Sequence, residues 1–171
     1  ILQDQNLLNL GVQLPNIVKK SKTLKDIYTS ILFDYQNTRG KNIVGDKDPK
    51  NIEFLRTIHA FFPKAIVIHI YRDPRAVISS RNKAKWSKGR PLWMNILAYK
   101  SQFIYGKSVG KSIFNSYFEI KYEDLVLNPK KELKILCDQI GISFENNMLD
   151  FFKNSDKVVQ GEEIEWKKNI F

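Results

Sequence analysis

The spacing of apolar residues predicts a chain of alternating helices and strands. Apolar side chains recur every three or four positions over residues 24–35 and 49–62, which is the period of a helix, with Thr23 as a possible N-cap and Pro63 as a stop. Residues 65–71 are apolar at nearly every position, which is typical of a parallel strand covered on both faces. We expect two further short strands, a buried one over residues 42–45 and one over residues 117–122.

The second half of the chain adds four predicted helices. One follows Asp73, one covers residues 91–114, one starts at Pro129 after Asn128 and stops before Gly141, and a shorter one covers residues 146–152. Residues 81–90 are basic and form a predicted loop, which could equally line the path of an acidic acceptor; we slightly prefer a solvated loop. Strands that alternate with helices predict an α/β fold with a mostly parallel sheet.

Two places in the sequence share one arrangement, in which an apolar segment is followed by a cation and then by Asp-Pro. They are Lys47-Asp48-Pro49 and Arg72-Asp73-Pro74. Asp is a good N-cap and Pro suits the first helical position, so each Asp-Pro predicts the start of a helix. The free N–H groups of a helix N-terminus attract anions, and the preceding cation adds a full charge. We therefore expect Lys47 and Arg72 to lie at the carboxyl ends of adjacent parallel strands and to bind a ligand with two or more anionic groups.

Length and charge bound the class of protein. The chain has 171 residues, enough for one domain with its own core, and a net charge of +10. That charge favours a polyanionic ligand such as a nucleotide, nucleic acid or sulfated glycan, although a basic surface without such a ligand explains it equally well. No stretch of eighteen apolar residues occurs, and the first residues do not have the pattern of a signal peptide. With one cysteine and therefore no intrachain disulfide, these features slightly favour a cytoplasmic protein.

Several residues that invite a chemical interpretation are better explained by structure. Cys137 lies on the apolar stripe of a predicted helix, where a buried structural thiol is expected. His59 and His69 lie among apolar residues and are expected to be packed in the core. Glu123 and Asp124 are neighbours on one strand end and point in different directions, so they do not form a glycosidase pair.

Three motifs taken together resemble the sulfotransferases that use 3′-phosphoadenosine 5′-phosphosulfate (PAPS). They are Lys47-Asp48-Pro49, the segment from Tyr71 through Arg75 with Ser80, and the segment from Lys121 through Pro129. The resemblance is nearest to the branch with bacterial sulfotransferase-like domains and tyrosylprotein sulfotransferases, and it covers residues 45 to about 168. It implies a P-loop-NTPase-like three-layer α/β/α fold and a single sulfotransferase-like domain over residues 1–171.

The resemblance also implies roles for individual residues. Arg72 and Ser80 would hold the 3′-phosphate of the donor, with Ser79 a weaker candidate, and Lys47 would contact the transferring sulfuryl group. A salt bridge to a neighbouring helix is the alternative for Arg72. Tyr122 would lie near the adenine, although a core tyrosine at a strand end explains it almost as well. A C-terminal loop that closes over the donor would include Trp166, Lys167 and Lys168.

One expected feature of the family is missing from this sequence. A Gly-rich phosphate loop would normally follow the first strand, but the early region offers only Gly11. The chain also lacks a starting Met and has few predicted strands, so we expect that an N-terminal strand and this loop are missing from it, and we favour this over the alternative of a degenerate domain. The general base cannot be named for the same reason.

The predicted activity is transfer of a sulfuryl group from PAPS to a hydroxyl, or less favourably an amine, of an acceptor whose identity the sequence does not give. Positioned cations can supply this catalysis without a metal. Two alternatives stay open: a nucleotide or nucleoside kinase of P-loop type, and a non-catalytic basic module that binds nucleic acid or a sulfated polymer. Nucleic acid is not favoured as the partner.

Overall fold

The computed structural model describes residues 11–12, 14–84 and 87–154. The chain divides into two compact units, Ile1–Asn51 and Ile52–Phe171.

The first unit is built around two helices, α2 (Leu14–Lys20) and α3 (Leu24–Thr38). Thr23 caps α3 as predicted: its hydroxyl accepts from the backbone N–H of Asp26 at 3.1 Å, while the Asp26 carboxylate accepts from the Thr23 N–H at 2.9 Å. This reciprocal capping box satisfies two of the donors that a helix start leaves unpaired. Buried Val12 and Ile17 pack against apolar side chains of α3 and form the small core of this unit.

The segment that follows α3 does not form the strand predicted over residues 42–45. Among the described residues it pairs with no strand, and the Ile43 side chain is 70% exposed. Only Ile43 and Val44 are apolar there, which is too short a run to bury a strand on two faces. Lys47 therefore lies in a loop, and the prediction that it follows a parallel strand is wrong.

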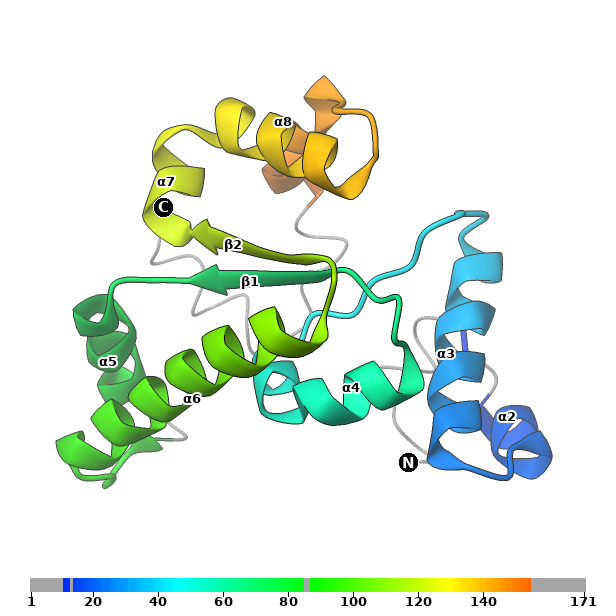
Figure 1. The fold of residues 1–171 in the computed structure, drawn as a ribbon, viewed down its shortest axis with the longest axis horizontal. Coiled ribbons are helices and arrows are strands. Elements are labelled where there is room, and N and C mark those ends of the chain that lie inside the picture. The colour runs from blue at the N-terminus through cyan, green and yellow to red at the C-terminus, as the bar shows by residue number, and fades with distance from the viewer. Residues whose placement is uncertain (1–10, 13, 85–86, 155–171) are drawn as a thin grey trace. The chain divides into compact units, whose positions relative to one another are not determined.

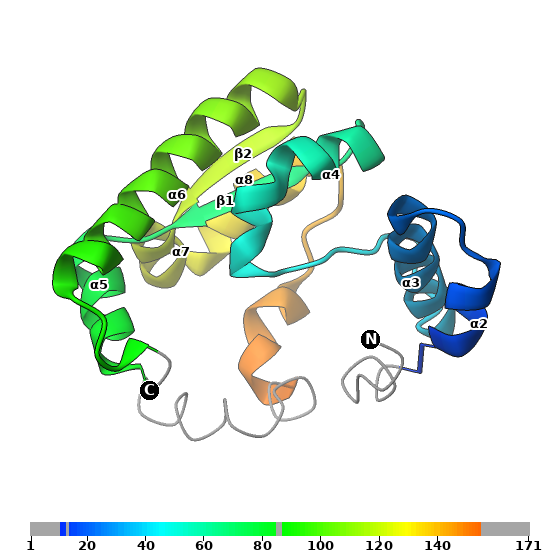
Figure 2. The ribbon, with the colours of Figure 1, turned by 90° about the horizontal axis from the view of Figure 1, so that it is seen from below.

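The second unit contains the sheet and most of the helices, which Figure 1 and Figure 2 show from two directions. The predicted helix over residues 49–62 is two elements, the 3₁₀ helix η1 (Pro49–Phe54), which begins in the first unit, and α4 (Leu55–Phe61). The remaining elements are, in order, β1 (Val67–Tyr71), α5 (Pro74–Lys83), α6 (Leu92–Ile113), β2 (Tyr117–Lys121), α7 (Tyr122–Leu127), α8 (Pro129–Ile140) and the 3₁₀ helix η3 (Asn146–Asn154).

The sheet of the described residues has two parallel strands. Val67 pairs with Tyr117 and Tyr71 with Lys121, so β1 and β2 run in register over five residues. Helices α4 and α6 lie along one side of the strands, and α7 and α8 lie on the other (Figure 1 and Figure 2). The α/β class and the parallel pairing are confirmed. The strand predicted over residues 117–122 is found as β2, and the one predicted over residues 42–45 is not found among the described residues.

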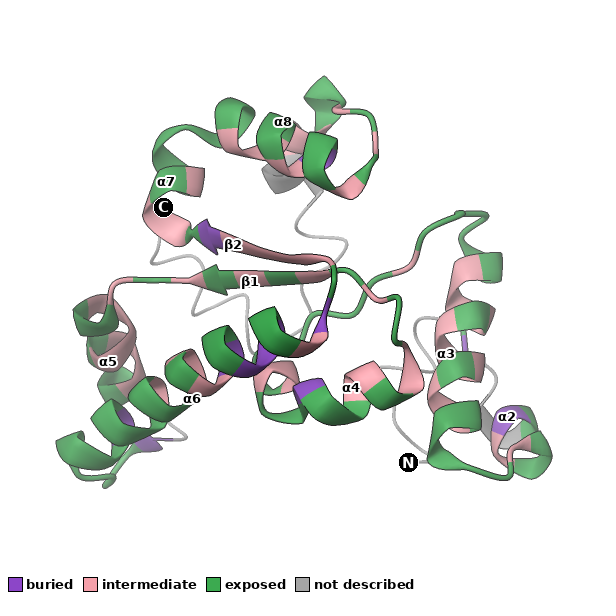
Figure 3. Ribbon diagram, viewed as in Figure 1, coloured by how far each residue is buried: buried purple, intermediate pink, exposed green. Residues whose placement is uncertain are grey.

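The core of the second unit lies between the strands and the helices α4 and α6. Leu55, Val109 and Phe114 are its buried members, and Figure 3 shows buried positions on α4, on the later part of α6 and before β2. On β1 the alternate residues Val67, His69 and Tyr71 are half-buried, whereas Ile68 and Ile70 are 40% and 53% exposed. The prediction that both faces of this strand are covered is therefore wrong for the described part of the chain.

Helix α6 approaches the sheet closely because two of its buried positions are glycine. A Cβ atom added at Gly110 would come within 2.1 Å of the Tyr117 ring, and one added at Gly106 within 2.2 Å of the Ile52 side chain. The absence of a side chain at these two positions sets the distance between α6 and the elements beside it.

We predict that Gly110→Ala lowers the free energy of unfolding by about 2 kcal/mol, because overpacking against the Tyr117 ring outweighs the gain of about 1 kcal/mol in helix propensity. Denaturant unfolding measures this change. Ser108→Ala, at an exposed position of the same helix, is the matched control and should be neutral. A Gly110→Ala protein as stable as the control would contradict the close approach.

His69 lies on the core face of β1 among aromatic side chains. Its Nδ1 shares a hydrogen bond with the Tyr117 hydroxyl, and the rings of Tyr71 and Phe103 lie 6.1 Å from its own. Burial lowers the His69 pKa below its ordinary value of 6.5, and Lys107 lowers it further against the opposing effect of Glu119. The prediction that His69 is a packed histidine is confirmed. His59 is also half-buried, with its ring edge-on to Phe114.

We predict that His69 makes the fold less stable in mild acid. Its folded pKa is depressed, so its contribution is present above the ordinary pKa of 6.5 and is lost as the pH falls below that value. Unfolding free energies measured between pH 8 and pH 5 should therefore decline for the natural chain and less steeply for His69→Gln. Equal slopes in the two proteins would contradict this assignment.

Helix α8 begins and ends at the residues that its sequence predicts, with one difference at the N-cap. Pro129 is its first residue and Gly141 ends it in the left-handed conformation at φ 74°. Asn128 stands at the N-cap position, but its side chain makes no capping hydrogen bond. Cys137 is 2% exposed and its thiol donates to the Met148 sulfur at 3.8 Å, which confirms the predicted structural thiol.

Candidate anion-binding site

The turn from β1 into α5 carries three charged residues close together in the sequence, Arg72, Asp73 and Arg75. Arg72 directly follows the last residue of β1, and Asp73 caps α5 by accepting from the Arg75 N–H at 2.8 Å. The Arg75 guanidinium also donates to the Asp73 carboxylate at 2.6 Å and lowers the pKa of that carboxyl to about 2. The predicted cation, Asp-Pro and helix start are thus present at the carboxyl end of a parallel strand.

The Arg72 side chain is exposed and lies against one aromatic ring. Its guanidinium carbon is 4.7 Å from the centre of the Tyr122 ring, a cation–π distance. Within residues 11–12, 14–84 and 87–154, its guanidinium makes no ion pair and no hydrogen bond. The alternative of a salt bridge to a neighbouring helix is therefore not supported among the described residues.

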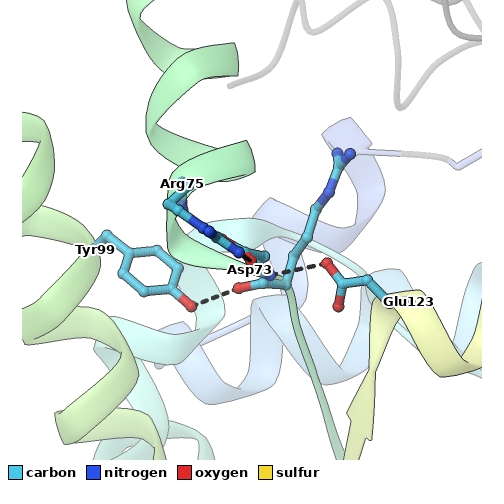
Figure 4. Close-up of polar contacts among 5 residues, drawn as sticks. Asp73, Arg75, Tyr99 and Glu123 are labelled. Atoms are coloured by element: carbon cyan, nitrogen blue, oxygen red, sulfur yellow. Dashed lines mark hydrogen bonds and ion pairs between the residues drawn. The ribbon is translucent and has the colours of Figure 1, made fainter.

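Two side chains from other helices hold the backbone at this turn. The Tyr99 hydroxyl on α6 donates to the Arg72 carbonyl oxygen at 2.7 Å, and the Asp73 N–H donates to the Glu123 carboxylate on α7 at 2.9 Å. Figure 4 shows both contacts converging on the start of α5 from opposite sides. Sequence reasoning misses both residues: Glu123 lies within the motif from Lys121 through Pro129 but has no role assigned there, and no motif includes Tyr99.

The predicted serines lie further along α5. Ser80 is the seventh residue of the helix, about 9 Å along its axis from the start, and is half-buried, whereas Ser79 is exposed. No hydrogen bond among the described residues joins Ser80 to Arg72. Ser80 is placed on the same helix as the predicted phosphate site, and its contact with a ligand stays a prediction.

Lys47 lies in the first unit, in a loop where the aspartates on either side of it make hydrogen bonds. The Asp46 carboxylate accepts from the Tyr28 hydroxyl at 2.7 Å and from the Asn51 amide at 2.8 Å. Burial and this contact raise the pKa of Tyr28. Asp48 accepts from the Lys50 N–H at 2.7 Å at the start of η1, so the Asp-Pro prediction of a helix start holds here also. Lys47 itself is exposed between these two anchored aspartates.

The predicted site residues are only partly brought together. Arg72 and Tyr122 are in contact, and Tyr122 begins α7 where a strand end was predicted. Lys47 belongs to the other compact unit. Trp166, Lys167 and Lys168, the predicted closing loop, lie outside the described residues, as does Trp86.

Comparison with protein families gives one match. A model described as the sulfotransferase family matches residues 16–146, which is most of the chain, and the chain belongs to that family. The match includes Lys47, Arg72, Ser80 and Tyr122. No curated protein and no solved structure matches the chain significantly.

Two features are absent from the described residues. These residues contain no group of three or more His, Cys, Asp or Glu side chains placed to hold a metal ion. They also contain no helix long and apolar enough to cross a membrane.

Proposed function

We propose that this protein transfers a sulfuryl group from PAPS to a hydroxyl, or less favourably an amine, of an acceptor. The observation that carries the proposal is the exposed Arg72 guanidinium, which has no acidic partner among the described residues and precedes the N-terminus of α5. A guanidinium offers several N–H donors in one plane, which suits a phosphate group, and a helix start adds backbone donors. Membership in the sulfotransferase family supports the type of reaction.

In this proposal Arg72 and Ser80 bind the 3′-phosphate of the donor. Arg72 supplies charge and paired donors, and Ser80 adds one neutral donor. The Asp73 carboxylate does not compete for the Arg72 guanidinium, because it is already held by Arg75 and by the start of α5. Tyr122 binds the adenine through its hydroxyl or the ring face that Arg72 leaves open. Trp166, Lys167 and Lys168 close over the donor.

Lys47 is proposed to stabilise the charge that develops during transfer. The bond between sulfur and the bridging oxygen of the phosphosulfate breaks, and a new bond forms between sulfur and the acceptor oxygen. The bridging oxygen leaves with the electron pair as part of 3′-phosphoadenosine 5′-phosphate (PAP), and the acceptor hydroxyl gives its proton to a base. An ammonium group near the bridging and equatorial oxygens lowers the barrier electrostatically, and the proposal requires no metal.

The proposal also includes the fold that the family implies, a P-loop-like three-layer α/β/α arrangement of the whole chain. The parallel pairing of β1 with β2 and the helices on two sides of them support it. A phosphate loop that grips the 5′-phosphosulfate has no counterpart among the motifs of this sequence.

A transfer assay tests the proposed reaction. The full chain is incubated with ³⁵S-labelled PAPS and a panel of phenols, sugars, tyrosine peptides and amines, and labelled product and PAP are measured together. The proposal predicts labelled product with stoichiometric PAP for at least one acceptor class. Transfer of label from γ-³²P-ATP, with none from PAPS, would overturn it in favour of the kinase alternative.

A further inference from the structure

We propose that Tyr99 and Glu123 are positioning residues that hold Arg72 for the 3′-phosphate of the donor. Neither residue touches the ligand in this scheme; both act through the backbone between Arg72 and Asp73. The inference rests on the proposed function, because it assigns the two residues to the donor site proposed above.

Both hydrogen bonds end on the same peptide group. The carbonyl oxygen of Arg72 and the N–H of Asp73 belong to one planar unit. Tyr99 binds its oxygen at 2.7 Å and Glu123 binds its hydrogen at a nitrogen–oxygen distance of 2.9 Å. Hydrogen bonds at both ends of this planar group oppose its rotation, which restricts ψ of Arg72 and so limits the directions in which the Arg72 side chain leaves the backbone.

Helix α7 contacts the turn at Arg72 through two of its residues. Glu123 fixes the peptide group, and the preceding residue, Tyr122, lies against the guanidinium at 4.7 Å. Because these two residues are adjacent at the start of α7, backbone and side chain of Arg72 are held by one short element. Tyr99 reaches the same peptide from α6, so three helices meet at this turn.

The Glu123 carboxylate is held as an anion at this turn: the hydrogen bond from the Asp73 N–H lowers the pKa of the carboxyl below its ordinary value. Its second oxygen is buried and has no hydrogen-bond partner among the described residues. Burying an unpartnered carboxylate oxygen carries a desolvation cost, and a group of this kind in a native structure calls for an explanation. Fixing the arginine that recognises the donor provides one.

Loss of either contact should therefore affect recognition of the 3′-phosphate more than general binding. In a variant without one of these contacts, the peptide can rotate, so Arg72 loses conformational entropy when it binds phosphate. In the natural chain this entropy is already lost on folding and does not weaken binding. Ligands without a 3′-phosphate do not use Arg72 and should be almost unaffected. The ratio of the dissociation constants for adenosine 5′-phosphate and PAP isolates this effect.

The test compares binding of PAP and adenosine 5′-phosphate to the full chain and its variants by calorimetry. Tyr99→Phe removes a single oxygen atom, and Glu123→Ala removes the acceptor. One hydrogen bond of this kind is worth about a factor of three to ten, so each variant should reduce the ratio by about that factor. Glu123→Gln keeps an acceptor oxygen and should restore most of it. Tyr105→Phe on α6 and Asp124→Ala beside Glu123 are the matched controls and should leave the ratio unchanged.

A second arm asks whether the effect passes through Arg72. In an Arg72→Ala background, Tyr99→Phe should no longer change PAP binding, because there is no guanidinium left to position. An unchanged ratio in Tyr99→Phe and Glu123→Ala, with the natural chain still preferring PAP, would overturn the inference and leave the proposed function standing. No preference for PAP in the natural chain would overturn the proposed function itself.

Discussion

Replacing Arg72 by alanine is expected to weaken PAP binding by about a hundredfold and to leave adenosine 5′-phosphate binding nearly unchanged. The reason is that the guanidinium has no acidic partner among the described residues and lies over the Tyr122 ring at the start of α5. A hydrogen bond between a cation and a phosphate contributes about 1.5–3 kcal/mol. Loss of two such bonds, or of one with good geometry, therefore accounts for a loss of about a hundredfold in PAP affinity. Calorimetric titration with the two ligands measures it.

The control for the Arg72 prediction is Arg56→Ala. Arg56 is exposed on α4 in the same unit, so its removal lowers the net charge equally without touching the turn after β1. It should leave PAP affinity within a factor of two, and Arg72→Lys should give an intermediate loss, since an ammonium group keeps the charge and loses the planar fork. Equal losses for Arg72→Ala and Arg56→Ala would mean that PAP is attracted by charge alone.

Replacing Lys47 by alanine is expected to lower turnover by two to three orders of magnitude with little effect on PAP affinity. A group that stabilises charge only in the transition state raises the turnover rate and leaves ground-state affinity unchanged. Removal of one such donor lowers turnover by about two to three orders of magnitude in other enzymes. The Asp46 carboxylate accepts from Tyr28 and Asn51, and Asp48 from the Lys50 N–H, and no ion pair joins Lys47 to either aspartate among the described residues. Steady-state rates with labelled PAPS and single-turnover measurements give the two quantities separately.

Lys41→Ala is the matched control for Lys47. Lys41 is an exposed lysine of the same loop and carries the same charge. Turnover of Lys41→Ala should equal that of the natural chain. If Lys47→Ala also turned over at the natural rate, the assignment of Lys47 to the transferring group would be wrong.

Local signals in the sequence predicted the elements around the site well. Asp73 followed by Pro74, Thr23 before an apolar stripe, and Gly141 after one each mark a helix end through their own chemistry, and each is found where the sequence places it. The apolar run before Arg72 predicted β1, because a strand with Ile and Val at successive positions has no helical period.

Features that depend on distant residues could not be predicted. Tyr99 lies 27 residues after Arg72 and Glu123 lies 50 residues after Asp73, and no periodicity connects such pairs. The missing strand at residues 42–45 is an error of another kind. Two adjacent apolar residues, Ile43 and Val44, resemble a short buried strand, but without pairing partners among the described residues they form a loop.

The measurement that tests the central claim most directly is calorimetric titration of the full chain with PAP, with adenosine 5′-phosphate and ADP as control ligands. The account predicts tighter binding of PAP than of either control, and loss of that preference in Arg72→Ala. Equal affinity for the three ligands, or affinity that falls steeply with salt and ignores the 3′-phosphate, would contradict a donor site at Arg72 and favour a non-catalytic basic module.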